Sequence, residues 1–176
     1  MKIHTKQSTF ALYFRNFIFG VEDSLVSTVG LLSGIAIAGV PRATIFLTGM
    51  VLIFVEGFSM GVGSFLSEDS SEGVMHQKQV KDFHVILAAI IMFISYFFAG
   101  FIPLFPYTIL ETPKAFPVSI LLSLVTLFIL GLISARYSKR NYLKTGLKML
   151  VIGGIAIGLG VFVGAAIQQW GSGIVA

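Results

Sequence analysis

The sequence contains no cysteine and few charged residues, and each shortage excludes a class of protein. Without cysteine there is no disulfide, no thiolate metal site and no thiol nucleophile. Only 11% of the residues are charged and 56% are hydrophobic, whereas about 25% of the residues in a soluble globular domain are charged. The composition therefore excludes a soluble globular domain, and equally a disordered, collagen-like or disulfide-stapled chain.

Catalytic motifs are missing as well. The sequence has no His-Glu-x-x-His zinc motif, no Gly-x-Ser-x-Gly nucleophile turn and no phosphate-cradling glycine-rich loop. The histidines are divided between the N-terminus and one polar segment, which does not make a catalytic set. We therefore expect a protein that is not an enzyme and that has no prosthetic cofactor.

Long apolar runs dominate the chain, and a transmembrane helix needs about 20 mainly apolar residues. We predict an all-α membrane protein with a single domain over residues 1–176. Its five transmembrane helices are expected at about 17–40, 43–66, 85–110, 118–135 and 149–167. The third run is continuously apolar from Val85 to Ile102, before Pro103. The first run, from Phe17, is too long for a cleaved signal peptide and lacks a small-residue cleavage site, so we expect it to be retained.

The basic residues indicate the orientation of these spans. All Lys and Arg residues except Arg42 and Lys114 precede the first span or lie in the second and fourth connections. Because positively charged loops stay on the cytoplasmic side, we expect a cytoplasmic N-terminus and an external C-terminus. The net charge of +4 is thus explained by helix orientation rather than by nucleic-acid binding. Short connections favour a prokaryotic cell membrane, or a vacuolar-type membrane if the protein is eukaryotic.

Glycines spaced by four residues occur in three of the predicted spans. Such pairs let helix backbones approach closely in lipid, where contact area supplies the attraction. They predict a tightly packed bundle or an oligomer and say nothing of cargo. The pairs are Gly30 with Gly34, Gly57 with Gly61, Gly154 with Gly158, and Gly160 with Gly164.

Three carboxylates lie inside predicted spans, namely Glu22, Asp23 and Glu56. A carboxylate at mid-span costs about 2.5 to 3.5 kcal/mol, so it normally faces a bundle interior or a water-filled path. At about 1.5 Å rise per residue, Asp23 and Met60 both lie roughly 10 Å from the cytoplasmic end of their spans. The second span also carries one polar face, made of Glu56, Ser59, Met60, Gly63 and Ser67.

These carboxylates, together with hydroxyls and one thioether, would suit a small divalent cation. Carboxylates alone favour hard ions, whereas a thioether favours a softer ion such as Fe²⁺. Two simpler interpretations stay open. Met60 is also an ordinary gap filler in a helix bundle, and Glu22 and Asp23 could instead lie at the inner surface, paired with Arg15.

Residues 67–84 are predicted to form a short cytoplasmic loop. Read as a helical extension of the second span, this segment places Glu68, Glu72 and His76 at positions i, i+4 and i+8. Carboxylates plus imidazole could capture Fe²⁺ or Zn²⁺ at the cytoplasmic mouth. A simply solvated loop is the alternative interpretation.

Three motifs resemble those of the vacuolar iron transporter family. Gly20–Thr28 (GVEDSLVST) resembles the family's Gly-Ala-Asn-Asp-Gly-Leu-Val-Ser. Ser59–Ser67 (SMGVGSFLS) is similar to its Ser-Met-Ala-x-Gly-Glu-Tyr-x-Ser, and Gly100–Tyr107 (GFIPLFPY) matches its Gly-x-x-Pro-x-x-Pro-Tyr. The motifs follow one another in the family's order over nearly the whole chain. The sequence departs from the family at Glu22, usually Asn, and at Ser64, often Glu.

The resemblance implies a five-span homodimer that moves Fe²⁺, and often Mn²⁺, out of the cytosol in exchange for protons. It implies a path along the dimer interface, between the first two spans of each subunit, lined by Asp23 and Met60. Glu56 is a candidate replacement for the acid missing at Ser64. The 67–84 loop is too short for the metal-binding domain of larger members.

A mechanism follows as a hypothesis. Burial disfavours a charged carboxyl, so without metal Glu22, Asp23 and Glu56 are expected to hold protons that an arriving divalent cation expels. Pro103 and Pro106 could form a hinge that lets the third span bend. Two alternatives stay open: a passive divalent-cation channel, and a membrane scaffold that does not transport.

Overall fold

The computed structural model describes residues 2–75 and 82–174, which form six α-helices. They are α1 (Lys2–Ile37), α2 (Arg42–Met75), α3 (Asp82–Leu104), α4 (Pro106–Ile109), α5 (Thr112–Ser138) and α6 (Tyr142–Ile174). Five segments are long and apolar enough to cross a membrane: Thr9–Ile37, Arg42–Glu68, Phe83–Leu104, Thr112–Ser138 and Tyr142–Trp170. The predicted all-helical fold with five candidate spans is confirmed.

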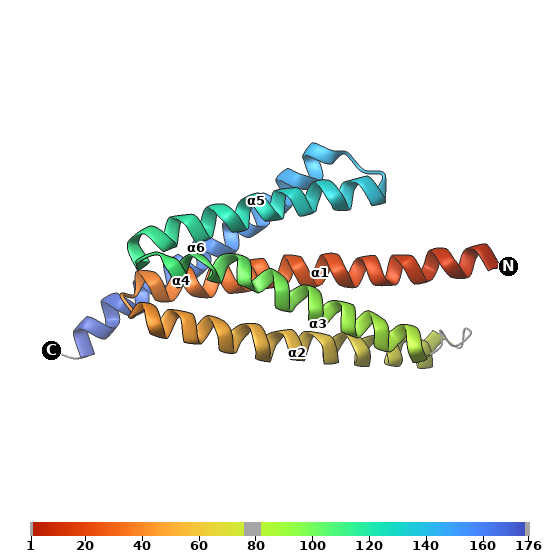
Figure 1. The fold of residues 1–176 in the computed structure, drawn as a ribbon, viewed down its shortest axis with the longest axis horizontal. Coiled ribbons are helices and arrows are strands. Elements are labelled where there is room, and N and C mark those ends of the chain that lie inside the picture. The colour runs from red at the N-terminus through yellow and green to blue at the C-terminus, as the bar shows by residue number, and fades with distance from the viewer. Residues whose placement is uncertain (1, 76–81, 175–176) are drawn as a thin grey trace.

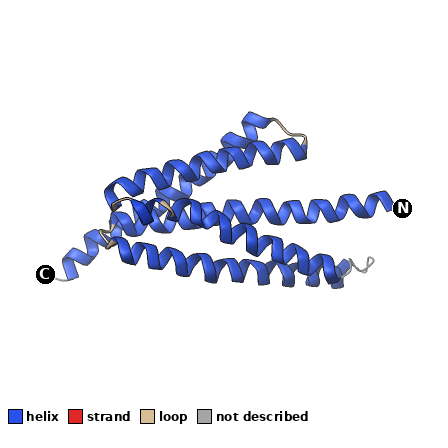
Figure 2. Ribbon diagram, in the orientation of Figure 1, coloured by secondary structure: helices blue, strands red, loops and turns tan. Residues whose placement is uncertain are grey.

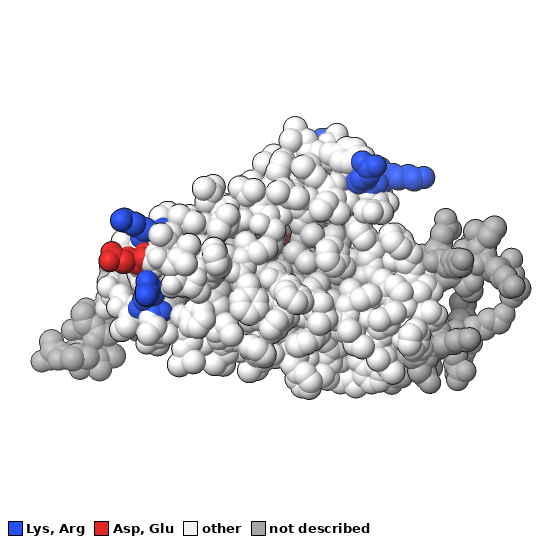
Figure 3. Space-filling model, viewed as in Figure 1, with Lys and Arg blue, Asp and Glu red and all other residues white. Residues whose placement is uncertain are grey.

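The helices run along one axis and are joined by short connections (Figures 1 and 2). Figure 1 places the N-terminus, the end of α2, the start of α3 and the α5–α6 turn toward one end of the bundle, here called the N-terminal end. The α1–α2 turn, α4 and the C-terminus lie at the other end, here called the C-terminal end. On the face drawn in Figure 3, charged side chains lie at the two ends and the band between them is almost entirely uncharged. This distribution is typical of a protein that spans a bilayer.

Helix α1 is the central helix of the bundle. It packs against α2, α3, α5 and α6, while α2 packs mainly on α3, and α5 on α6. Half of the most apolar stretch of the α1 span is buried, against 17% for α6. The span that carries the adjacent carboxylates Glu22 and Asp23 is thus also the most enclosed of the five described candidate spans.

The third span ends earlier than predicted. The sequence analysis extended it to about residue 110, but α3 ends at Leu104 and a separate four-residue helix, α4, begins at Pro106. Proline has no backbone N–H, so Pro106 cannot continue the helical ladder, and it is well placed to begin a new helix instead. The predicted hinge residues Pro103 and Pro106 therefore flank a real break, and both are buried.

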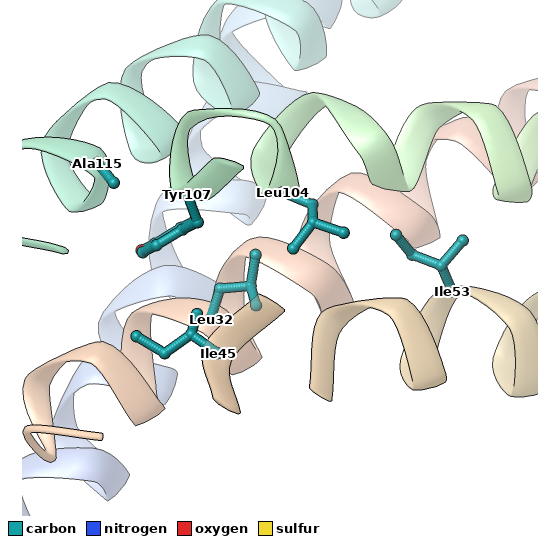
Figure 4. Close-up of a cluster of buried hydrophobic side chains, with 6 residues drawn as sticks. All are labelled: Leu32, Ile45, Ile53, Leu104, Tyr107 and Ala115. Carbon is teal, nitrogen blue, oxygen red and sulfur yellow. The ribbon is translucent and has the colours of Figure 1, made fainter. Parts of the chain in front are cut away.

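A hydrophobic cluster surrounds this break at the C-terminal end. It joins five helices and consists of Leu32, Ile45, Ile53, Leu104, Tyr107 and Ala115 (Figure 4). All six side chains are at most 1% exposed. The break between α3 and α4 is thus surrounded by side chains that are almost completely buried.

Ser119 of α5 holds the break from the other side. Its hydroxyl donates a hydrogen bond of 2.7 Å to the carbonyl oxygen of Pro103, and the side chain is fully buried. We predict that Ser119→Ala destabilises the protein by about 1 to 3 kcal/mol, because a buried carbonyl loses its donor. Thermal unfolding of purified protein in detergent measures this loss. Thr126→Ala is the control, because Thr126 bonds within its own helix; equal melting of the two variants would contradict the prediction.

Glycine contacts bring α1 and α6 together. A Cβ added to Gly34 would lie 2.7 Å from the carbonyl oxygen of Gly160, and one added to Gly164 would lie 2.7 Å from the carbonyl carbon of Gly34. A Cβ at Gly160 would likewise meet the backbone of Gly30. The two helix backbones are therefore in direct contact, as small residues permit in membrane helices.

The other glycine pairs differ in what they contact. Gly57 and Gly61 of α2 lie against α3, where an added Cβ would be 3.2 Å from the Tyr96 ring and 3.1 Å from Phe93 Cβ. Gly154 and Gly158, in contrast, have no atom of the described residues within 4 Å of an added Cβ. Each precedes a contacting glycine of α6 by six residues, which turns it by about 120° around the helix. Of the two interpretations of the glycine pairs, a packed bundle or an oligomer, the packing within the chain thus accounts for the other pairs and not for Gly154 with Gly158.

Candidate functional site

A cavity of about 860 Å³ opens between α1, α2, α3 and α5 toward the N-terminal end of the bundle. We call it the entrance cavity. Its inner wall carries one carboxylate and two thioethers, from Glu22 of α1, Met60 of α2 and Met92 of α3. Nearer the bundle end its polar lining consists of Arg15, Asn16, Ser64, Ser67, Glu68, Ser134, Tyr137 and Ser138. Potential cation ligands thus line the inner part of the cavity, and other polar side chains line the part nearer the bundle end.

Close packing of α1 on α3 positions Glu22 in this wall. A Cβ added to Gly20 would be 2.8 Å from the backbone carbonyl oxygen of Met92, so only glycine permits this approach. Glu22 follows two residues later and is half-buried. A positive charge lies within electrostatic range of it, at Lys148 of α6.

Asp23 and Glu56 lie outside the described lining of the entrance cavity but are electrostatically coupled to it. Asp23 is close enough to both Glu22 and Glu56 to interact with each of them electrostatically. Glu22 and Asp23 are consecutive on α1 and point about 100° apart. Of the two, Glu22 is the one that lines the cavity.

Tyr96 of α3 connects the deeper carboxylate to α1. Its hydroxyl donates a hydrogen bond of 2.7 Å to Glu56 Oε2, and the Ser27 hydroxyl lies 2.7 Å from the same Tyr96 oxygen. Because the phenol proton is directed at Glu56, Ser27 acts as the donor to Tyr96. The Ser24 hydroxyl also donates 2.6 Å to the Tyr96 carbonyl. Tyr96 is fully buried, so this network holds Glu56 in a fixed orientation.

These positions differ from the ligand set that the sequence indicated. The four residues Glu22, Asp23, Glu56 and Met60 lie in one region, but they are divided between the cavity wall and the network behind it. Within residues 2–75 and 82–174, no three His, Asp or Glu side chains are grouped closely enough to hold a metal ion. The oxygen and sulfur atoms of these side chains are therefore spread over the region rather than gathered into one cluster.

Polar contacts between helices surround the mouth. Arg15 forms an ion pair with Glu68, and Ser64 donates a hydrogen bond of 2.5 Å to Asn16 Oδ1. A third contact, between the Tyr13 hydroxyl and His84 Nδ1 at 2.6 Å, joins α1 to α3. The alternative pairing of Arg15 with Glu22 or Asp23 is thus not the one found.

The predicted capture site falls partly on this mouth. Helix α2 continues to Met75, so Glu68 and Glu72 do lie on one helical extension of the second span. Glu68 is committed to the ion pair with Arg15. His76 lies outside the described residues.

Two residues of this region were missed in the sequence analysis. Met92 resembled any other apolar residue of its span, so no sequence signal separates it from packing. Tyr96 carried a usable signal, because a hydroxyl in the middle of an apolar helix needs a hydrogen-bond partner. The partners themselves, Glu56 and Ser27, depend on how the three helices are rotated against one another.

Fold and site together define a multi-pass helical membrane protein with carboxylate and methionine side chains between its spans. The sequence model of the VIT family matches residues 14–85 and 75–165, which together include most of the residues that line the cavity. The chain therefore belongs to the VIT family, the vacuolar iron transporters, as its motifs suggested. Membership makes it a membrane metal-ion transporter in a family of transporters rather than enzymes. No curated protein matches the chain.

Proposed function

We propose that the protein moves divalent iron, and also manganese, out of the cytosol in exchange for protons. The observation that carries this proposal is the set of carboxylate and thioether side chains that lie inside the spans of a VIT family member. Glu22, Met60 and Met92 face the entrance cavity, Asp23 is coupled to Glu22 and Glu56, and Glu56 is oriented by Tyr96. Oxygen and thioether ligands of this kind suit a divalent ion of intermediate softness.

Proton exchange follows from the chemistry of partly buried carboxyl groups. A carboxyl group taken out of water favours its neutral form, which is the form that carries an exchangeable proton. A divalent cation binds the deprotonated form and displaces those protons. Release on the far side then requires only that protons return to the same carboxylates, which is the exchange reaction of an antiporter.

The proposed orientation places the entrance cavity on the cytoplasmic side. The cavity opens at the N-terminal end, where all Lys and Arg residues apart from Arg42 and Lys114 are predicted to lie. We further infer a homodimer in a prokaryotic cell membrane. In the single chain Glu22, Asp23, Glu56 and Met60 are all only partly buried, and α2 exposes Val55 and Phe58 by 64% and 67%. A second copy of the chain packed against α1 and α2 would cover both the partly buried polar residues and the exposed apolar side chains of α2.

Flux into proteoliposomes tests the proposal. Purified protein is reconstituted, and entry of Fe²⁺ and Mn²⁺ is recorded with and without an imposed pH gradient. We expect metal entry that accelerates when the gradient favours protons moving in the opposite direction. Entry that ignores the gradient would indicate a passive channel, and no entry of either metal would indicate a scaffold; each result contradicts the proposed exchange.

Removing the Tyr96 hydroxyl tests the role of the deeper carboxylate. We predict that Tyr96→Phe lowers the maximal Fe²⁺ rate roughly tenfold, because Glu56 loses a hydrogen bond worth about 1.5 kcal/mol or more that fixes its orientation. The measurement is initial Fe²⁺ entry at saturating metal. Tyr107→Phe is the matched control, since Tyr107 is also buried and its hydroxyl interacts with Ser119 rather than with Glu56. Equal rates in the two variants would contradict this role.

A further inference from the structure

Two thioethers face the entrance cavity from different helices. Met60 was expected to line the path, whereas Met92 of α3 was not, yet both contribute to the wall that holds Glu22. The packing of α2 on α3 sets them at one level. A Cβ added to Gly61, the neighbour of Met60, would lie 3.1 Å from Cβ of Phe93, the neighbour of Met92.

The sulfur of Met92 is placed beside the carboxylate-bearing turn of α1. The side chain is 4% exposed, and its Sδ would lie 3.2 Å from a Cβ added to Gly20. The missing side chain at Gly20 therefore leaves room for the thioether. Glu22 follows on the next part of the same turn and faces the same cavity.

This grouping has a chemical consequence for the choice of ion. A thioether is a soft, polarizable ligand that favours Fe²⁺ over hard ions, whereas Mn²⁺ prefers carboxylate, carbonyl and water oxygens. One thioether beside a carboxylate gives a weak preference. A second thioether, from another helix, replaces a position that could otherwise hold an oxygen ligand or a water, and so penalises Mn²⁺ further.

We propose that Met92 is a specificity-determining residue of the transport path, which with Met60 favours Fe²⁺ over Mn²⁺. This inference rests on the proposed function. Packing alone would also place a methionine at this position, because an unbranched thioether fills irregular gaps. The two roles differ in what leucine does: a volume-conserving Met-to-Leu exchange keeps the packing and removes the sulfur.

The test compares Fe²⁺ and Mn²⁺ entry into proteoliposomes at equal, subsaturating concentrations. For Met92→Leu we expect the ratio of Fe²⁺ to Mn²⁺ rates to fall at least about threefold, through a loss of Fe²⁺ entry with Mn²⁺ entry preserved. Met92→Gln, which offers an oxygen in place of sulfur, should lower the ratio further. Met50→Leu is the control, because Met50 packs near the cluster at the C-terminal end and is not among the described residues that line the cavity.

Three outcomes overturn the inference. These are an unchanged ratio, a loss shared equally by both metals, and an equal fall in Met50→Leu. If Met92→Leu fails to fold, as judged by gel filtration, Met92→Gln carries the same comparison. Wild-type protein that transports neither metal would instead refute the proposed function, so the two failures are distinguishable.

Discussion

Asp23→Asn is expected to lower metal entry by about a hundredfold or more in protein that still folds. The substitution of asparagine for aspartate keeps the shape of the side chain but removes both its negative charge and its ability to release a proton. Asp23 interacts electrostatically with Glu22, which lines the entrance cavity, and with Glu56, which accepts a hydrogen bond from Tyr96. We therefore expect it to take part in passing the ion from one carboxylate to the other. An amide at that position interrupts the series, because a divalent ion inside a bilayer needs charged oxygen ligands to offset the loss of water.

The measurement is Fe²⁺ entry into proteoliposomes containing equal amounts of variant and wild type. Gel filtration and thermal unfolding establish that the variant is intact. Glu111→Gln provides a matched control, because Glu111 is an exposed carboxylate at the C-terminal end, between α4 and α5. Undiminished Fe²⁺ entry through a well-folded Asp23→Asn variant would remove Asp23 from the path.

Gly164→Ala is expected to destabilise the bundle, because the added methyl group collides with the backbone of α1. A Cβ there would lie 2.7 Å from the carbonyl carbon and 2.8 Å from Cα of Gly34. Backbone atoms cannot rotate away as a side chain can, so α6 must move from α1. Overpacking of this kind costs about 1 to 3 kcal/mol, and we expect the melting midpoint in detergent to fall by roughly 5 °C.

Gly158→Ala supplies the control on the same helix. No atom of the described residues lies within 4 Å of a Cβ added there, so its midpoint should stay close to that of wild type. If both variants melt together, the α1–α6 contact does not limit stability. Transport by Gly164→Ala should fall along with stability, because α1 carries Glu22 and Asp23.

The elements of the fold were largely predictable because a bilayer permits few structures. A segment crossing lipid must satisfy its backbone internally, so a sufficiently long apolar run becomes a helix. The run length therefore located all five spans. The predicted end of the third span was wrong for an equally physical reason. The sequence stays mostly apolar as far as Leu110, and hydropathy does not register that Pro106 lacks the N–H needed to continue α3.

Which residues belong to the candidate site was easier to predict than how they are placed relative to one another. Glu22, Asp23, Glu56 and Met60 could be singled out because each is unusual in lipid or falls in a motif. Which of them face one another depends on helix rotation, and these helices are apolar nearly all round. With no strongly polar side to mark the solvent, the sequence does not reveal that Glu22 rather than Asp23 faces the cavity.

Long-range partners were beyond the sequence for the same reason. Arg15 finds Glu68, and Glu56 finds Tyr96, across different helices. Glu56 is nevertheless instructive. Its mid-span position predicted a buried carboxylate that must be satisfied, and the Tyr96 hydroxyl supplies the hydrogen bond that such a group requires.

The most direct test of the account records both ions at once. Proteoliposomes carry one dye for Fe²⁺ and one for internal pH, and Fe²⁺ is added outside with no initial gradient. We predict that Fe²⁺ entry is accompanied, with the same time course, by a rise in internal pH as protons leave, and that both signals are absent from vesicles without protein. Fe²⁺ entry with a constant internal pH would contradict proton exchange by this protein.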